Sequence, residues 1–191
     1  MSNIAIKGAA TGSGTFTLEA PATSTNRTLV LPDEAGTVLT SASSIPAANL
    51  TGTVVQTNVP AFRAFRPGTQ NPSRYTWTKV TLSSETFDTD SSFDSTTDYR
   101  FTPTIAGYYQ FNAFGAATGS PPEAYVAVRQ NNAGVITAWF NASGVSQWTG
   151  AISGLLYANG TTDYFELFVY TAAASPAFSS LSFSGILVRA A

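Results

Sequence analysis

The chain has 191 residues, of which 43% are apolar and only 10% are charged. This composition is too apolar for a disordered chain, and 27 threonines and 21 serines supply much of the polar surface. The net charge of −2 and the lack of a basic block argue against nucleic-acid binding. The absence of cysteine and histidine excludes His-dependent triads, cysteine nucleophiles and Cys/His zinc sites. No apolar run approaches the roughly 20 residues of a membrane helix, so we expect no membrane insertion.

The N-terminal part of the chain predicts a small β module. Two alternating segments, 15–18 and 27–31, flank a turn-rich stretch and are typical of a hairpin. This part contains a single aromatic residue, Phe16, and a sheet of this size is marginal alone. We therefore expect a β-hairpin attachment module over residues 1–44, followed by a linker over residues 45–59.

Residues 60–191 contain nearly all of the aromatic residues and predict a separate β domain. Turn-forming residues separate nine candidate strands, at 61–65, 75–82, 98–103, 107–116, 124–130, 135–141, 148–158, 163–172 and 180–189. No segment has the periodicity of an amphipathic helix. Eight or nine strands at this spacing are typical of a sandwich, a jelly roll or a barrel.

Two of these strands are apolar on both faces. Ile186 and Val188 point away from the face that carries Leu187, and Phe168 points away from the face of Leu167. Because an exposed sheet face is usually polar, Phe168, Ile186 and Val188 predict an interface between subunits. The alternative is a set of scattered exposed apolar residues, which soluble proteins commonly carry.

Two motifs of this domain resemble a known family. The segment FDSTTDYRFTPTIAGYYQF (93–111) and the segment FSGILV (183–188) resemble the globular head of the complement q subcomponent. That family belongs to the tumour-necrosis-factor-like jelly rolls. The resemblance covers about residues 60–191 and implies an all-β jelly roll that trimerises around a threefold axis. Tyr109 and Phe111 should then fill the core, and Gly107 should allow a sharp turn into a strand.

The N-terminal part resembles a different kind of protein. The sequence FTLEAPATSTNRTLVLPDEAGTVLT (16–40) is similar to a module that recurs in bacteriophage tail-fibre and baseplate-appendage proteins. The following segment, IPAANLTGTV (45–54), is similar to the short connector repeats of such fibres. The pairing of this module with a terminal jelly roll implies a short phage fibre.

Five of the eleven acidic residues are clustered early in the β domain. Asp88, Asp90 and Asp94 are weak candidates for calcium ligands, because carboxylate oxygens suit this ion. The spacing fits no EF-hand loop, and a solvated acidic loop is the alternative. A carboxylate pair could cleave glycosides, with Asp88, Asp90, Asp163 and Glu166 as the candidates, but the chain is too short for the long solenoids that usually do so. We therefore expect no enzymatic activity and no cofactor.

One group of residues suggests contact with a receptor. Trp139 and Phe140 are adjacent in a candidate strand, so one of them must face away from the local core. Asn141, Gln147 and Trp148 follow closely. An aromatic plate beside amide groups is typical of sugar binding, so Trp139, Asn141, Gln147 and Trp148 are candidate receptor contacts. The alternative is that both tryptophans pack in the core or in a subunit interface.

Together these features predict a virion protein located on the phage tail. The expected protein is a homotrimeric short tail fibre that binds other virion proteins through residues 1–44. Its partner on the host would be a surface glycan, contacted by residues 60–191. One alternative is a structural decoration protein of the capsid, neck or baseplate. A more remote alternative is a glycan-degrading enzyme.

Overall fold

The computed structural model describes residues 59–119, 122–141, 144 and 146–191, with residues 11, 22, 24–26 and 28 near the N-terminus. The chain divides into two compact units, Met1–Gly52 and Thr53–Ala191. Apart from Thr28, the strands predicted for the attachment module lie outside the described residues, so that hairpin stays a prediction. Within the described part of the chain, no helix is long and apolar enough to span a membrane.

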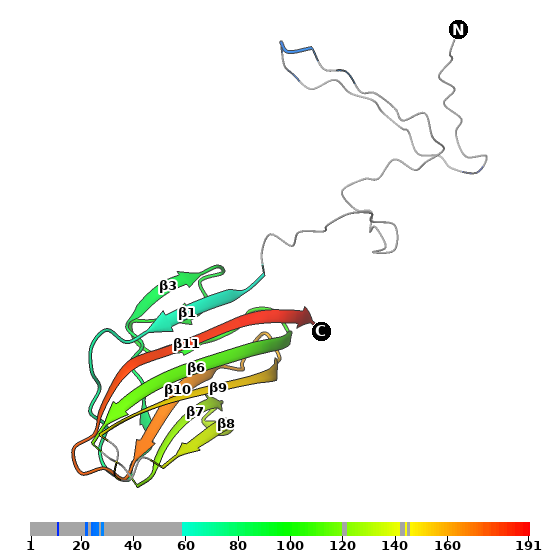
Figure 1. Cartoon of the computed structure of the whole chain (residues 1–191). Helices are drawn as coiled ribbons and strands as arrows, with labels where there is room; N and C mark the ends of the chain where they lie inside the picture. Colours follow the sequence, from blue (N-terminus) through cyan, green and yellow to red (C-terminus); the bar gives the residue numbers. More distant parts are fainter. Residues whose placement is uncertain are drawn as a thin grey trace. The chain divides into compact units, whose positions relative to one another are not determined.

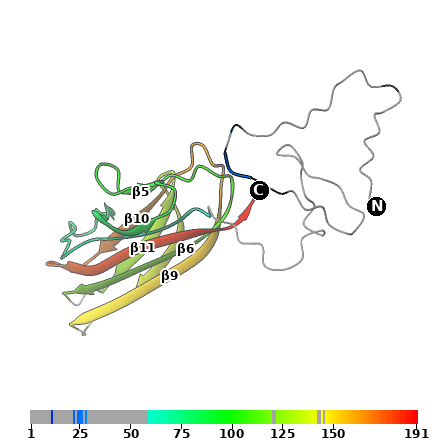
Figure 2. The same cartoon turned by 90° about the horizontal axis from the view of Figure 1, so that it is seen from above.

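The described part of the second unit is a sandwich of two antiparallel sheets (Figure 1). Sheet A consists, in spatial order, of β3 (Ser84–Asp88), β1 (Ala61–Phe65), β11 (Ala177–Ala190), β6 (Gly107–Thr118) and β9 (Gln147–Ala158). Sheet B consists of β4 (Phe93–Asp94), β5 (Arg100–Phe101), β10 (Phe165–Thr171), β7 (Ala124–Gln130) and β8 (Ala133–Phe140), with β2 (Thr78–Lys79) paired to β10. Figure 2 shows the three long strands of sheet A lying side by side.

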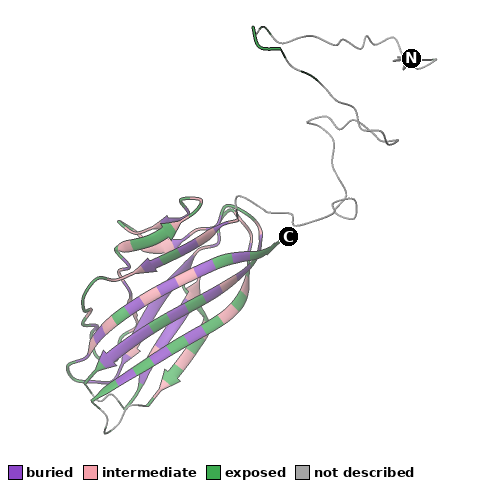
Figure 3. Ribbon diagram, turned by 45° about the horizontal axis from the view of Figure 1, so that its top comes forward, coloured by how far each residue is buried: buried purple, intermediate pink, exposed green. Residues whose placement is uncertain are grey.

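The long strands alternate between buried and exposed residues, as the two-residue period of a strand requires (Figure 3). The inward residues form one core that is rich in aromatic rings. Phe111 of β6 joins the two sheets, because its ring centroid lies 4.3 Å from that of Phe165 on β10. The expectation that Tyr109 and Phe111 fill the core is confirmed, since both residues are fully buried.

Two glycines of β9 let β8 close one side of the sandwich. A Cβ atom on Gly150 would lie 2.2 Å from the ring of Phe140, and one on Gly154 would lie 2.4 Å from Cδ1 of Ile136. Phe140 and Ile136 of β8 therefore occupy the space that a side chain on β9 would need at the two glycine positions. The edge strands of the two sheets are in this way packed against each other.

Several details differ from the sequence-based predictions. The strand expected at 75–82 is reduced to Thr78–Lys79, because Tyr75 has a positive φ of 58° and belongs to a turn. The strands β3 and β4 were not predicted at all. Gly107 does not allow a turn: a Cβ atom there would lie 2.4 Å from the backbone oxygen of Arg189, so the glycine permits the close approach of β11.

Candidate functional site

The outer face of sheet A carries an exposed apolar patch at one end of the sheet. It consists of Tyr108 on β6, Leu155 and Tyr157 on β9, and Ile186 and Val188 on β11, and we call it the sheet A patch. Each of these residues keeps between 44% and 61% of its surface exposed. The strand register joins them, since Tyr108 pairs with Tyr157, while Gln110 pairs with both Leu155 and Ile186.

Gln110 lies within the sheet A patch, between Leu155 and Ile186, and Ser153 and Asn112 border the patch on the same face. Gln110 donates a hydrogen bond of 2.7 Å to the hydroxyl of Ser153, which donates one of 2.9 Å to Asn112. Phe114 on β6 and Phe87 on β3 are also exposed on sheet A, outside the patch, so the patch gathers most and not all of the exposed apolar side chains of this sheet. A contiguous apolar area with a polar rim is typical of a surface that another molecule covers. Ile186 and Val188, two of the three predicted interface residues, lie within it.

Phe168, the third predicted interface residue, is covered by its own chain. It lies on the outer face of sheet B and is only 8% exposed. The guanidinium of Arg129 lies over its ring, with Cζ 4.2 Å from the ring centroid. The prediction that Phe168 contacts a neighbouring subunit is therefore wrong, because little of this side chain is left for a second chain to cover.

The four candidate receptor contacts do not form one cluster. Trp139 is 55% exposed on the outer face of sheet B, whereas Gln147 is exposed on the outer face of sheet A. Trp148 is only 8% exposed and faces the core, where it stacks on Phe140 with ring centroids 4.9 Å apart. The prediction that Trp148 contacts a receptor is therefore wrong, and the alternative of core packing holds for it. Asn141 is exposed at the end of β8.

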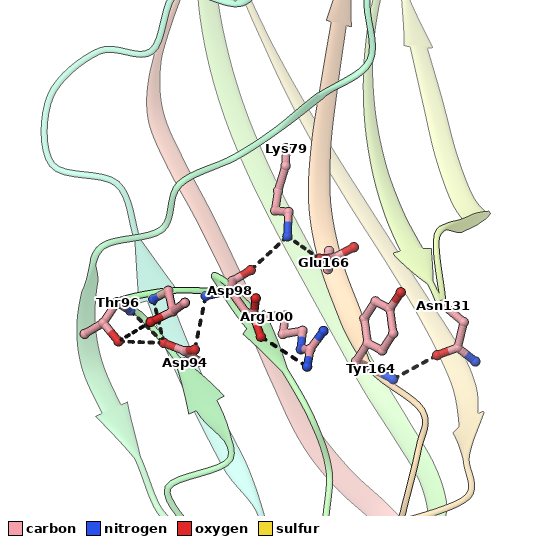
Figure 4. Close-up of polar contacts among 9 residues, drawn as sticks. Lys79, Asp94, Thr96, Asp98, Arg100, Asn131, Tyr164 and Glu166 are labelled. Carbon is pink, nitrogen blue, oxygen red and sulfur yellow. Dashed lines mark hydrogen bonds and ion pairs between the residues drawn. The ribbon is translucent and has the colours of Figure 1, made fainter.

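Each of the three candidate calcium ligands accepts hydrogen bonds from residues of its own turn. Asp94 accepts hydrogen bonds from the backbone N–H groups of residues 96–98 and from the Thr96 hydroxyl (Figure 4). These bonds hold the pKa of the Asp94 carboxyl well below its usual range. Asp88 accepts from the backbone N–H of Phe93 at 2.7 Å, and Asp90 from the hydroxyl of Ser92 at 2.6 Å. The described residues contain no group of three acidic side chains that could hold a metal ion.

The other two carboxylates considered for glycoside cleavage, Glu166 and Asp163, also have structural partners. Glu166 is 2% exposed and forms an ion pair of 2.6 Å with Lys79, whose ammonium group also donates to the backbone oxygen of Asp98 (Figure 4). Asp163 accepts hydrogen bonds from the side chain of Asn131 and from the backbone N–H of Asn159. Both groups therefore fix the positions of neighbouring segments.

Sequence reasoning missed a cluster of aromatic residues on sheet B. Trp77, Tyr125 and Tyr170 line a shallow hollow of about 350 Å³ together with Glu123. These residues come from three separate parts of the chain. Their alternation within β7 and β10 indicates that Tyr125 and Tyr170 point outward, but only the pairing of the strands places them side by side.

No family model and no curated protein matches this sequence. Solved structures do resemble it: murine APRIL at pH 5.0 aligns with a TM-score of 0.55 and 7% identity, over 68% of this chain and 99% of that one. The vertex protein P5 of PRD1 aligns with a lower TM-score of 0.49 and 13% identity, over 70% of this chain and 98% of that one. The globular domain of zebrafish complement 1qA aligns with a TM-score of 0.45 and 16% identity, over 69% of this chain and 99% of that one. The described β domain therefore has the all-β jelly-roll fold of the tumour-necrosis-factor type, as the sequence predicts.

Proposed function

We propose that this protein is a trimeric phage appendage, a short tail fibre that binds the virion through residues 1–44 and contacts the host with its jelly roll. The observation that carries the trimer in this proposal is the sheet A patch, and the location on a phage rests on the resemblance of residues 16–54. Five apolar side chains lie together on one face, where a single subunit leaves them in contact with water. Full burial of an exposed side chain of this kind is worth about 1.5–3 kcal/mol, and each of these residues, already close to half buried, would contribute about half of that.

The resemblance of the sequence to trimeric complement-type heads supports a threefold assembly over a pair. In such an assembly each copy of the patch would be covered by neighbouring copies of the same chain. The paired rings of Tyr108 and Tyr157 and the aliphatic residues of β9 and β11 would form the apolar centre of the interface.

The N-terminal part supports a location on the virion. Its motif is similar to a module of phage tail fibres, and residues 1–59 contain only one aromatic residue, Phe16. A segment with so little apolar area to bury gains most from folding against a partner. We place the contact with other virion proteins there, and the contact with the host in the jelly roll, with Trp139, Asn141 and Gln147 as exposed candidates.

Electron microscopy of labelled protein tests this proposal. Phage particles that lack the protein are incubated with the full chain or with a variant that lacks residues 1–44. We expect the full chain to bind the tail and to restore adsorption to host cells, and the shortened chain to stay in solution as a trimer. Equal binding of the shortened chain would show that attachment lies in the jelly roll. Binding of the full chain without any effect on adsorption would identify a decoration protein instead.

A further inference from the structure

A row of aromatic side chains crosses the outer face of sheet B. Tyr125 on β7 pairs with Trp139 on β8 and with Tyr170 on β10, so the three side chains stand next to one another on one face. Trp77, just before β2, joins them, with its ring centroid 5.4 Å from that of Tyr170 and 5.6 Å from that of Tyr125. We call these four residues the aromatic strip.

Three rings of the aromatic strip, those of Trp77, Tyr125 and Tyr170, are held in place before any ligand arrives. The guanidinium of Arg129 lies between two rings, with Cζ 4.9 Å from the centroid of Trp77 and 4.2 Å from that of Phe168. Tyr125 and Tyr170 meet edge to face at 5.4 Å. A ligand that binds here meets rings that are already ordered, which lowers the entropic cost of binding.

A strained residue lies beside the aromatic strip. Tyr75 has a φ of 58° and is 58% exposed. Its backbone N–H donates a hydrogen bond of 2.8 Å to the oxygen of Thr171, next to Tyr170, and Arg74 lies over its ring at 4.4 Å. Strained backbone is concentrated at functional sites, where the surrounding structure maintains it. Here it presents one more aromatic ring to the solvent.

The shape of the strip decides which class of ligand it can take. A cage for a quaternary ammonium group needs rings that surround an empty space, but the rings of Trp77, Tyr125 and Tyr170 touch one another. They form one wall of a shallow, open hollow instead. Such a wall suits a flat ligand with an apolar face, and the carbon-bound hydrogens of a sugar ring provide one.

The polar groups around the hollow complete this description. The exposed Glu123 lines the hollow, and its backbone oxygen is fixed by a hydrogen bond of 2.8 Å from the N–H of Ala172. Its carboxylate can accept hydrogen bonds from sugar hydroxyls, and the tyrosine hydroxyls can donate or accept them. Within the hollow the charged lining residue is Glu123, whose carboxylate repels a sugar carboxylate or phosphate placed there. The guanidinium groups of Arg129 and Arg74 lie at its edge, over the rings of Trp77 and Tyr75.

We propose that the aromatic strip is a binding site for neutral oligosaccharides. The inference deepens the proposed function, because it gives the chemical class of the host ligand and moves its site to sheet B. Trp139 then acts together with Tyr125 and Tyr170, and not with Trp148. The strip and the sheet A patch lie on opposite faces of the sandwich, so the two proposed contacts use different surfaces of the subunit.

Isothermal titration of the full chain tests the proposal. The probes are neutral oligosaccharides of glucose, of N-acetylglucosamine and of galactose, with oligogalacturonate as the acidic probe. We expect at least one neutral probe to bind at millimolar concentration or below, and more tightly than the acidic probe. Trp139→Ala should weaken this binding by about tenfold, and Trp77→Ala likewise. Trp139→Ala is the clearer test of binding, because Trp139 is largely exposed and its removal should leave the fold unchanged.

Two matched variants serve as controls. Phe87→Ala removes a similarly exposed ring from β3 of sheet A, outside both the sheet A patch and the aromatic strip, and should leave sugar binding unchanged. Glu123→Gln keeps a hydrogen-bond acceptor and should reduce the discrimination against the acidic probe. The proposal is overturned if no neutral probe binds, if the acidic probe binds more tightly, or if Trp139→Ala binds like the wild type. Sugar binding by a protein that fails to attach to particles would overturn the proposed function and leave this site intact.

Discussion

Tyr108 and Tyr157 face each other on β6 and β9, with ring centroids 5.6 Å apart and an interplanar angle of 62°. Both rings lie on the outer face of sheet A, and each is close to half exposed. An edge-to-face aromatic pair contributes about 0.5–1.5 kcal/mol beyond the area that it buries. The pair thus forms an ordered apolar surface that is ready to contact another chain.

The trimer is expected to depend on Ile186. In a separate subunit Ile186 is 46% exposed, so Ile186→Asp should leave the fold intact. In the assembly the new carboxylate would be buried without a partner, which costs about 3–5 kcal/mol. Light scattering of the full chain should therefore give three times the monomer mass for the wild type and the monomer mass for the variant.

The control is Val135→Asp, at a similarly exposed position on sheet B, which should remain trimeric. A wild-type monomer would contradict the prediction.

The two tryptophans of β8 and β9 should differ in their effect on stability. Trp148 packs between Phe140 and Phe178, so Trp148→Ala should lower the free energy of unfolding by about 3–5 kcal/mol. Trp139 is largely exposed, and Trp139→Ala should change the free energy of unfolding by less than about 0.5 kcal/mol. Urea denaturation followed by circular dichroism measures both values. Similar losses for the two variants would show that Trp139 is also part of the core.

The glycines of β9 should tolerate no side chain. Gly150→Ala places a methyl group 2.2 Å from the ring of Phe140, and the overpacking should cost about 1–3 kcal/mol. Gly134 of β8 is the matched control, because a Cβ atom there would meet its nearest neighbour, the Thr137 hydroxyl, at 3.7 Å. Gly134→Ala should therefore be close to neutral. The midpoints of thermal unfolding compare the two variants, and an unchanged midpoint for Gly150→Ala would contradict the packing of β8 on β9.

Asp94 should make the stability of the fold depend on pH in the acidic range. Backbone N–H groups of Thr97 and Thr96 hold the pKa of its carboxylate below the unfolded value of 3.8. The folded state therefore favours the ionised form. Its contribution is complete above the unfolded value and is lost as the pH falls through that value toward the folded pKa. Asp94→Asn keeps an acceptor oxygen but cannot titrate. The difference in urea midpoint between wild type and variant should shrink as the pH falls below the unfolded value, and a constant difference would exclude this role.

The long strands could be predicted from the sequence because their alternation is a local property. The strands β1 and β7 were predicted with their observed bounds, and the opposite orientations of Trp139 and Phe140 follow from their adjacency. The strand β3 was missed because none of its five residues is buried, so its sequence, SETFD, has no apolar face to recognise. Trp148 was misassigned although its strand alternates, because the inward positions next to it on β9 include Gly150 and Gly154, which give no apolar signal.

Which residues of the candidate site lie together depends on strand pairing between distant parts of the chain. The carboxylates of Asp88, Asp90 and Asp94 are close in the sequence, yet each folds back on its own turn. In contrast, Trp77 and Tyr170 are far apart in the sequence and touch in the structure. Which strands pair, and in which register, cannot be determined from a single sequence, so the aromatic strip could not be predicted.

The sandwich separates two surfaces by a closed core. The residues that would hold the assembly together project from β6, β9 and β11, whereas those of the aromatic strip project from β7, β8 and β10 and from the segment before β2. A substitution on one surface therefore need not alter the other surface. Selection for a new host ligand and selection for a stable particle can act on different residues of the same small domain, which allows the binding preference to diverge while the quaternary structure stays constant.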